Sequence, residues 1–146
     1  MVEVHVRTAR LTDLDAATRV LALNAIGSGR EADYLRNLLF VPSATVLVAE
    51  AERRVVGLGV LAIRPSVRSG PFVGVIDELG VADGSRPDDA DRRTIADQLV
   101  EHLASSARNK GCTRVEVAEP LASAEPALWK RVGFASRGSI LGRAIG

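Results

Sequence analysis

Residues 72–81, FVGVIDELGV, form an apolar segment that ends before a long helical pattern, and residues 113–119, TRVEVAE, form a second apolar segment directly after it. Gly111 suits the C′ position that ends such a helix. A strand, a helix and a strand in this order predict a right-handed crossover between parallel strands. The apolar stripe of the helix is formed by Ile95, Leu99, Val100, Leu103 and Ala107.

Two further apolar segments precede this unit, on either side of a short polar turn. Residues 44–50 (ATVLVAE) and 54–64 (RVVGLGVLAIR) predict an antiparallel hairpin. Before it, the alternation of valines at positions 2, 4 and 6 predicts a half-buried strand. Two helices are expected between these strands, the first capped by Thr12 and the second covering about residues 31–40.

The C-terminal part continues the same alternation of elements. Ser123 is expected to cap a short helix with Pro126 in its first turn, and residues 134–145 predict a closing pair of strands. The complete order is β-α-α-β-β-β-α-β-α-β, with no repeat or linker. It predicts a single α/β (α+β) domain over residues 1–146, with a mixed, mostly antiparallel sheet and helices on both faces.

Composition excludes several classes of function. The chain has 146 residues, 47% of them hydrophobic, with 19 basic and 18 acidic side chains and a formal charge of +1. This balance gives no electrostatic reason to expect nucleic acid or an anionic membrane as a partner. The single cysteine, Cys112, excludes an internal disulfide and a multi-cysteine metal site. No apolar run approaches the roughly 18 residues of a membrane span, so we expect a cytoplasmic protein. We also expect no metal site.

Five segments, in this order and spacing, resemble the GNAT superfamily of acyl-CoA-dependent N-acyltransferases. They are VRTARLTDLDAA (6–17), VLVAEAERRVVGLGVL (46–61), VIDELGV (75–81), GCTRVEV (111–117) and LWKRVGF (128–134). The resemblance implies that the two parallel strands splay apart, with the pantetheine arm of acetyl-CoA between them. It also implies that the start of the following helix holds the pyrophosphate, that the acceptor is a small-molecule or protein amine, and that a homodimer forms.

The chain departs from the family at that helix start. The signature there is Q/R-x-x-G-x-G/A, and residues 91–96 read DRRTIA, so only Ala96 fits. Either Asp88, Asp89 and Asp91 cap the helix and take the place of the phosphate, or Arg92 and Arg93 bind it. Pro87 could also start the helix early. The cofactor contacts that the resemblance implies are Leu79, Gly80, Val81, Arg92, Arg93, Thr94, Ile95, Ala96 and Trp129.

Trp129 stands where the family often has a tyrosine that protonates the departing thiolate. An indole N–H donates a hydrogen bond but is no physiological acid. The alternative role of Trp129 is hydrophobic packing.

Asp77 and Glu78 are the candidates for the base that deprotonates the amine. Strict strand alternation places Asp77 on the face of Leu79 and Val81, so we place Asp77 first and Glu78 second. A bulge would exchange their facing, and either acid could instead only pair with an arginine. A backbone N–H near Val81 would meet the oxyanion.

Two functions follow from these patterns. The first is an N-acyltransferase that moves an acetyl group from acetyl-CoA to an amine. The second is a GNAT-fold protein without catalysis that serves as a ligand-binding, regulatory or interaction domain.

Overall fold

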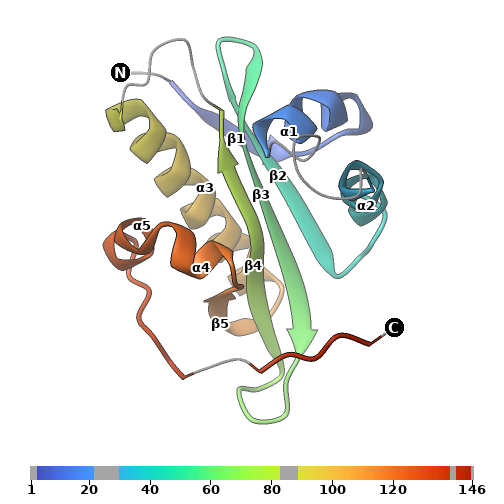
Figure 1. Cartoon of the computed structure of the whole chain (residues 1–146), viewed down its shortest axis with the longest axis vertical. Coiled ribbons are helices and arrows are strands. Elements are labelled where there is room, and N and C mark those ends of the chain that lie inside the picture. Colours follow the sequence, from blue (N-terminus) through green and yellow to red (C-terminus); the bar gives the residue numbers. More distant parts are fainter. Residues whose placement is uncertain (1–2, 22–29, 83–88, 139–140, 146) are drawn as a thin grey trace.

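The computed structural model describes residues 3–21, 30–82, 89–138 and 141–145. Figure 1 shows one twisted sheet with helices on both faces, and its strand order is β1-β2-β3-β4-β5. Neighbouring strands are antiparallel except β4 and β5, which are parallel, as the strand–helix–strand pattern predicts. The elements are β1 (His5–Thr8), η1 (Leu11–Asp13), α1 (Leu14–Val20), α2 (Glu31–Leu38), β2 (Ala44–Ala51), β3 (Arg54–Pro65), β4 (Phe72–Val81), α3 (Asp89–Asn109), β5 (Cys112–Val117), α4 (Leu121–Ala124) and α5 (Pro126–Arg131).

The predicted hairpin is confirmed as β2 and β3, joined through a two-residue turn. Glu52 and Arg53 both adopt a positive φ, 52° and 64°. Two consecutive left-handed residues define the turn whose twist matches that of antiparallel strands. The hairpin therefore forms although neither turn residue is a glycine.

The long helix α3 packs closely on one face of β3, because two glycines there carry no side chain. A Cβ atom built on Gly57 would lie 2.8 Å from Leu99 Cδ1, and one on Gly59 would lie 2.8 Å from Leu103 Cδ1. Leu99 and Leu103 are fully buried as a result. Gly111 follows the end of α3 with φ +87°, as its predicted C′ role requires.

The opposite face of the sheet is covered by α1 and α2. A second apolar cluster there includes Leu35 from α2, Ala17 from α1 and Leu58 and Val60 from β3. Because Leu58 and Val60 alternate with the glycines that face α3, the sheet separates two cores.

A buried ion pair fixes the chain as it passes from β1 into α1. Arg7 donates to both carboxylate oxygens of Asp13, at 2.8 and 3.0 Å, and to Glu50 at 2.9 Å. Asp13 also accepts the backbone N–H of Arg10 at 2.7 Å. The hydrogen bond from Arg7 is the main reason why the pKa of Asp13 is lowered. Asp13, and not the predicted Thr12, thus organises this helix start.

We expect the substitution Asp13→Ala to lower the free energy of unfolding by about 2 kcal/mol near neutral pH, because it leaves Arg7 and the Arg10 N–H without their shared acceptor. The pKa of Asp13 is lower in the folded protein than in the unfolded chain. Its ion pair therefore stabilises the fold at pH values above the unfolded pKa, and this stabilisation is lost as the pH falls through the folded pKa. Urea unfolding should therefore show the deficit shrinking below about pH 4. Asp15→Ala, at an exposed carboxylate of α1, is the control. A deficit that does not change with pH would contradict this role.

The predicted strand pair at residues 134–145 is wrong. Residues 134–138 and 141–145 form no strand, and Leu141 and Ile145 are 94% and 93% exposed. Strands form where apolar side chains are buried on at least one face, and here the apolar residues come in pairs between serine, arginine and glycine instead of alternating with them. Within the described residues, β5 therefore has β4 as its one strand neighbour.

No helix among the described residues has both the length and the apolar composition to cross a membrane.

Candidate active site

The parallel strands β4 and β5 pair along only the first half of β4. Their register runs from Phe72 opposite Cys112 to Ile76 opposite Val117, and the last bond joins Ala118 N–H to the carbonyl of Ile76 at 3.0 Å. Beyond this point β4 continues to Val81, whereas the β5 chain leaves it (Figure 1). The predicted splay of the two strands is thus replaced by an early end of β5 at Val117, which leaves the second half of β4 without a strand partner on that edge among the described residues.

A β-bulge lies on β4 where the strands part. Val60 on β3 pairs with Glu78 and the adjacent Leu61 pairs with Ile76, so Asp77 is the extra residue. Ile76 and Leu79 both pack in the core under α3 although they are three residues apart. Glu78 shares its face with Val60, which packs in the α1–α2 core. The bulge thus breaks the strict alternation on which the order of the two acids was based.

The bulge also sets the direction of the free backbone groups on β4. Ala82 donates its N–H to the carbonyl of Val56 at 2.7 Å, toward β3. Because successive residues of an antiparallel strand point their peptide groups to opposite edges, Val81 and Leu79 point theirs away from β3. That edge is where β5 has left. An extended amide-bearing chain could pair with it as a strand would.

A cavity of about 370 Å³ opens along this edge. Its walls come from the end of β4, the start of α3 and the start of α5. The residues that line it are Leu79, Gly80, Val81, Arg92, Arg93, Ala96, Glu125, Pro126, Ala127, Leu128 and Arg131. The volume lies within the range of small-molecule sites.

The charge of the cavity favours an anion. Three arginines, Arg92, Arg93 and Arg131, line it together with one carboxylate, Glu125. Arg131 is held by Asp97 of α3, with an Nη2–Oδ1 distance of 2.7 Å. Asp83 and Asp88 lie outside the described residues, as does Pro87. Among the described residues, the lining of the cavity therefore carries more basic than acidic side chains.

Six of the nine predicted cofactor residues line this cavity: Leu79, Gly80, Val81, Arg92, Arg93 and Ala96.

The side chains of the other three point elsewhere. Thr94 Oγ1 donates to the carbonyl of Ala90 at 3.0 Å, and Ile95 is buried against β3. Trp129 is buried, donates its Nε1–H to the carbonyl of Leu121 at 3.1 Å and stacks edge-on against Phe134. These contacts match the packing role considered for Trp129.

The start of α3 differs from the phosphate loop that the family signature describes. The helix already includes Asp89, so the N–H groups of residues 93–96 lie four positions after helical carbonyls. They are therefore engaged within the helix. The start of α3 therefore contributes the side chains of Arg92 and Arg93 to the cavity.

Asp77 and Glu78 have different surroundings. Asp77 is exposed, whereas Glu78 is half-buried. Burial, and secondly the negative charge of Asp77, raise the pKa of Glu78 above its ordinary value. Gly80, the next residue on the face of Glu78, lies under the end of α1, where a built Cβ would come 2.6 Å from Leu21 Cδ2. A carboxylate with raised pKa beside a cleft is a common feature of catalytic bases.

The α5 wall of the cavity was not identified from the sequence. Arg131 lies on the segment LWKRVGF (128–134), and Glu125 precedes that segment by three residues. Placing α5 against α3 would have required knowledge of the 2.7 Å contact between Arg131 and Asp97, two residues far apart in the chain.

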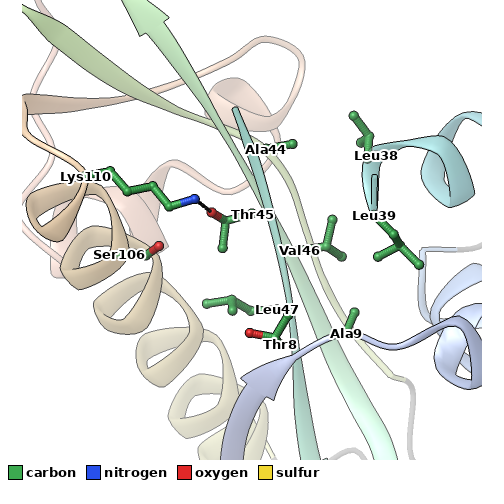
Figure 2. Close-up of a pocket in the computed structure, with 10 residues that line it drawn as sticks. All are labelled: Thr8, Ala9, Leu38, Leu39, Ala44, Thr45, Val46, Leu47, Ser106 and Lys110. Atoms are coloured by element: carbon green, nitrogen blue, oxygen red, sulfur yellow. Dashed lines mark hydrogen bonds between the residues drawn. The ribbon is translucent and has the colours of Figure 1, made fainter. Parts of the chain in front are cut away.

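A second cavity, of about 270 Å³, lies where β1 ends beside β2 (Figure 2). Its titratable group is Lys110, which donates to Thr45 Oγ1 at 2.7 Å. The remaining lining is apolar or carries hydroxyl groups, without a carboxylate or imidazole that could act as a base. The chemistry of acyl transfer is therefore better placed in the cavity beside β4.

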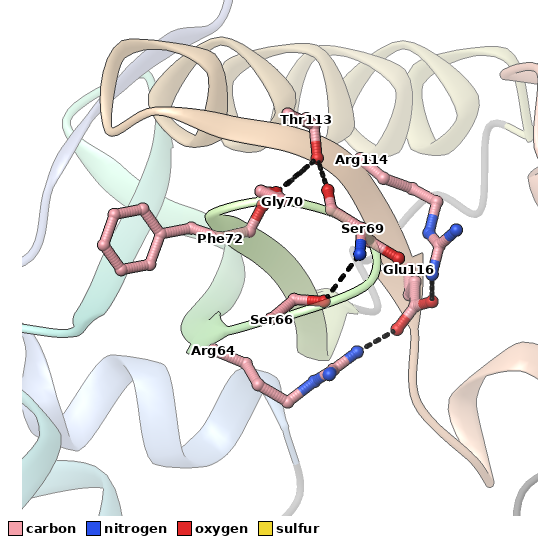
Figure 3. Close-up of polar contacts among 8 residues, drawn as sticks. All are labelled: Arg64, Ser66, Ser69, Gly70, Phe72, Thr113, Arg114 and Glu116. Carbon is pink, nitrogen blue, oxygen red and sulfur yellow. Dashed lines mark hydrogen bonds and ion pairs between the residues drawn. The ribbon is translucent and has the colours of Figure 1, made fainter.

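An ionic cluster lies on β3 and β5, across β4 (Figure 3). Glu116 accepts from Arg64 at 2.9 Å and from Arg114 at 2.8 Å, using a different oxygen for each. At the start of β5, Thr113 Oγ1 donates to the carbonyl of Ser69 and so connects β5 to the loop between β3 and β4. This cluster was not singled out in the sequence.

The parting of two parallel strands, with an arginine-lined cavity at the parting and a half-buried acid beside it, defines the class of acyl-CoA-dependent transferases that the sequence resembles. The sequence profile of the Acetyltransferase (GNAT) family matches residues 14–134. The chain belongs to the GNAT acetyltransferase family. None of the curated proteins matches it significantly in sequence.

Solved structures share the fold. The ribosomal-protein-alanine N-acetyltransferase from Brucella melitensis biovar Abortus superposes with a TM-score of 0.76 at 22% identity, covering 99% of this chain and 100% of that one. An aminoglycoside N-acetyltransferase in complex with CoA gives 0.75 at 17% identity, covering 99% and 96%. An acetyltransferase of Trypanosoma brucei gives 0.73 at 20% identity, covering 98% and 100%.

Proposed function

We propose that this protein transfers an acetyl group from acetyl-CoA to the amine of a small molecule. The observation that carries the proposal is the cavity beside β4, where β5 has ended, which brings strand amides and three arginines together next to the half-buried carboxylate of Glu78 on the same strand. Membership of the acetyltransferase family supports the same activity. The alternative of a GNAT fold without catalysis is not favoured, because neither the cleft nor the acid is lost.

Acetyl-CoA, which supplies the activated acetyl group, fits the chemistry of this cavity. The peptide groups of Leu79 and Val81 would pair with the amides of its pantetheine arm. Arg92 and Arg93, with Arg131 from the facing helix, would bind its phosphates. The arginine side chains take over a task that the family signature gives to backbone amides.

The residues at the bulge would carry the chemistry. Glu78, with Asp77 beside it, would take the proton of the acceptor ammonium, and its raised pKa makes it a stronger base for that step. The N–H of Leu79 would donate to the thioester oxygen, where negative charge develops. Trp129 gives no proton, because its N–H is bonded to Leu121. A thiol with a pKa near 8.5 can leave as the thiolate.

The amine acceptor is proposed as a small molecule because neighbours in fold include aminoglycoside acetyltransferases, one of them in complex with sisomicin. Two neighbours in fold are described as an aminoglycoside N-acetyltransferase and a ribosomal-protein-alanine N-acetyltransferase, and both act on amines. The homodimer and the cytoplasmic location stay predictions.

The direct test of the activity is incubation of the purified protein with acetyl-CoA and a panel of small amines. We expect thiol release equal to the acetylated amine that mass spectrometry detects. Thiol release without any acetylated amine, or no reaction across cationic, zwitterionic and neutral amines, would count against the proposal.

We expect the double substitution Arg92→Ala with Arg93→Ala to raise the KM for acetyl-CoA by roughly 10- to 100-fold, because it removes two charge-assisted contacts to phosphate. Initial rates at varied acetyl-CoA would measure this, and kcat should change little. Arg54→Ala, which removes an exposed arginine that does not line the cavity, is the matched control. An unchanged KM in the double variant would remove these arginines from the cofactor site.

A further inference from the structure

The cluster of Arg64, Glu116 and Arg114 lies on the same face of the sheet as Glu78. On β5, Val115 and Val117 pack in the core under α3, so the alternating residues Arg114 and Glu116 point to the other face. Glu78 points to that other face as well, because it pairs with Val60 of the α1–α2 core. The helices α1 and α2 pack mainly on β3 and β2, and the end of α1 lies over Gly80 of β4, beyond Glu78.

The cluster carries one excess positive charge, because two guanidinium groups share a single carboxylate. The Arg64 side chain is 52% exposed and that of Arg114 is 35% exposed, and each donates one N–H to Glu116 (Figure 3). Arg114 Nε is buried without a hydrogen-bond partner among the described residues. Each guanidinium group gives one N–H to Glu116, so both still have N–H donors for a second carboxylate.

The spacing along β4 sets the length of a ligand that could reach both groups. Along β3, which has no extra residue here, Glu78 is opposite Val60, and Val75, the partner of Glu116, is opposite Ala62, two residues further. Arg64 and Arg114 are both opposite Val73, at the level four residues from Val60. At about 3.3 Å per residue, the separation from Glu78 is about 7 Å for Glu116 and about 13 Å for the arginine backbones, so a carboxylate between them lies about 10 Å from Glu78. A tripeptide-sized molecule spans about this length.

We propose that the Arg64–Arg114 cluster binds the carboxylate of the acceptor, so that the acceptor is a small molecule with an amine at one end and a carboxylate about 10 Å away. This inference rests on the proposed acetyl transfer at Glu78. The amine end lies against the acidic pair Asp77 and Glu78, and the carboxylate end lies against the two arginines. The face is therefore complementary to a zwitterion rather than to a polycation.

Two matched substrates test this assignment: tri-alanine, with a free carboxylate, and tri-alanine amide, with the same amine and no carboxylate. We expect kcat/KM for the acid to be about tenfold or more above that for the amide, as the loss of a charge-assisted pair requires. Arg64→Gln should remove this preference by lowering kcat/KM for the acid, with the value for the amide and the KM for acetyl-CoA unchanged. Arg54→Gln, at a distant exposed arginine, should leave the preference intact.

Equal use of the two substrates, or a preference that survives Arg64→Gln, would overturn the proposal. Failure of the transferase itself is distinguishable by calorimetry. If no amine is acetylated, binding of tri-alanine to the protein that is lost in Arg64→Gln would still support the carboxylate site. Absence of that binding at millimolar tri-alanine would reject it.

Discussion

Replacing Glu78 by glutamine should lower kcat by about 100- to 10,000-fold, the usual contribution of a general base. The acceptor amine has a pKa near 10.4 when it is lysine-like, so it arrives protonated and needs an acceptor for its proton. Glutamine keeps the size of the side chain and removes the basic oxygen. The KM for acetyl-CoA should stay the same, because Glu78 is not among the residues that line the cofactor cavity. Initial-rate kinetics at saturating acetyl-CoA measure the effect.

Asp77→Asn is the matched control for this substitution. Asp77 is exposed, and its charge contributes to the raised pKa of Glu78. Removing that charge lowers the pKa of Glu78, and a base is active only when deprotonated. The acidic limb of kcat/KM should therefore move to lower pH, with a much smaller loss of kcat than in the glutamine variant. If Asp77→Asn abolishes turnover and Glu78→Gln does not, Asp77 is the base, as strict alternation of the strand indicates.

The second large effect concerns stability. Leu99→Ala should lower the free energy of unfolding by about 3–5 kcal/mol, at the upper end for such substitutions. Leu99 is fully buried against Gly57, which has no side chain that could move into the space. The surrounding strand is held by β2 on one side and β4 on the other, so it cannot collapse onto the cavity.

Urea denaturation of both proteins at the same pH gives this difference directly. Leu141→Ala removes the same atoms at a side chain that is 94% exposed and should change stability by no more than about 0.5 kcal/mol. A loss at Leu99 as small as that at Leu141 would show that α3 does not depend on its contact with the β3 glycines.

The central part of the fold could be predicted because its sequence patterns are long and unambiguous. The stripe from Ile95 to Ala107 has helical spacing over several turns, and the apolar segments on either side of it have strand length. The tail could not be predicted in the same way. The apolar side chains of residues 134–145 do not alternate with polar ones, and whether such a segment adds to a sheet depends on the strand edge beside it rather than on its own pattern.

The candidate site was predictable only in part. Gly80 and Val81 line the cavity as expected because they follow from where β4 ends. The bulge at Asp77 depends on a register shift between Val60 and Leu61 of a different strand, which no local pattern in residues 72–81 reveals. Burial of Glu78, and with it the preference for Glu78 as the base, follows from that shift. Arg131 enters the cavity through packing of α5 on α3, which is equally non-local.

The account depends most on acetyl-CoA lying between β4 and the start of α3. Titration of the ¹⁵N-labelled protein with acetyl-CoA, followed by backbone amide shifts, tests this most directly. We expect saturable changes concentrated at residues 79–82, 92–96 and 127–131, with little change at the hairpin turn around Glu52. No saturable change at millimolar acetyl-CoA, or changes confined to the cavity beside Lys110, would contradict the account.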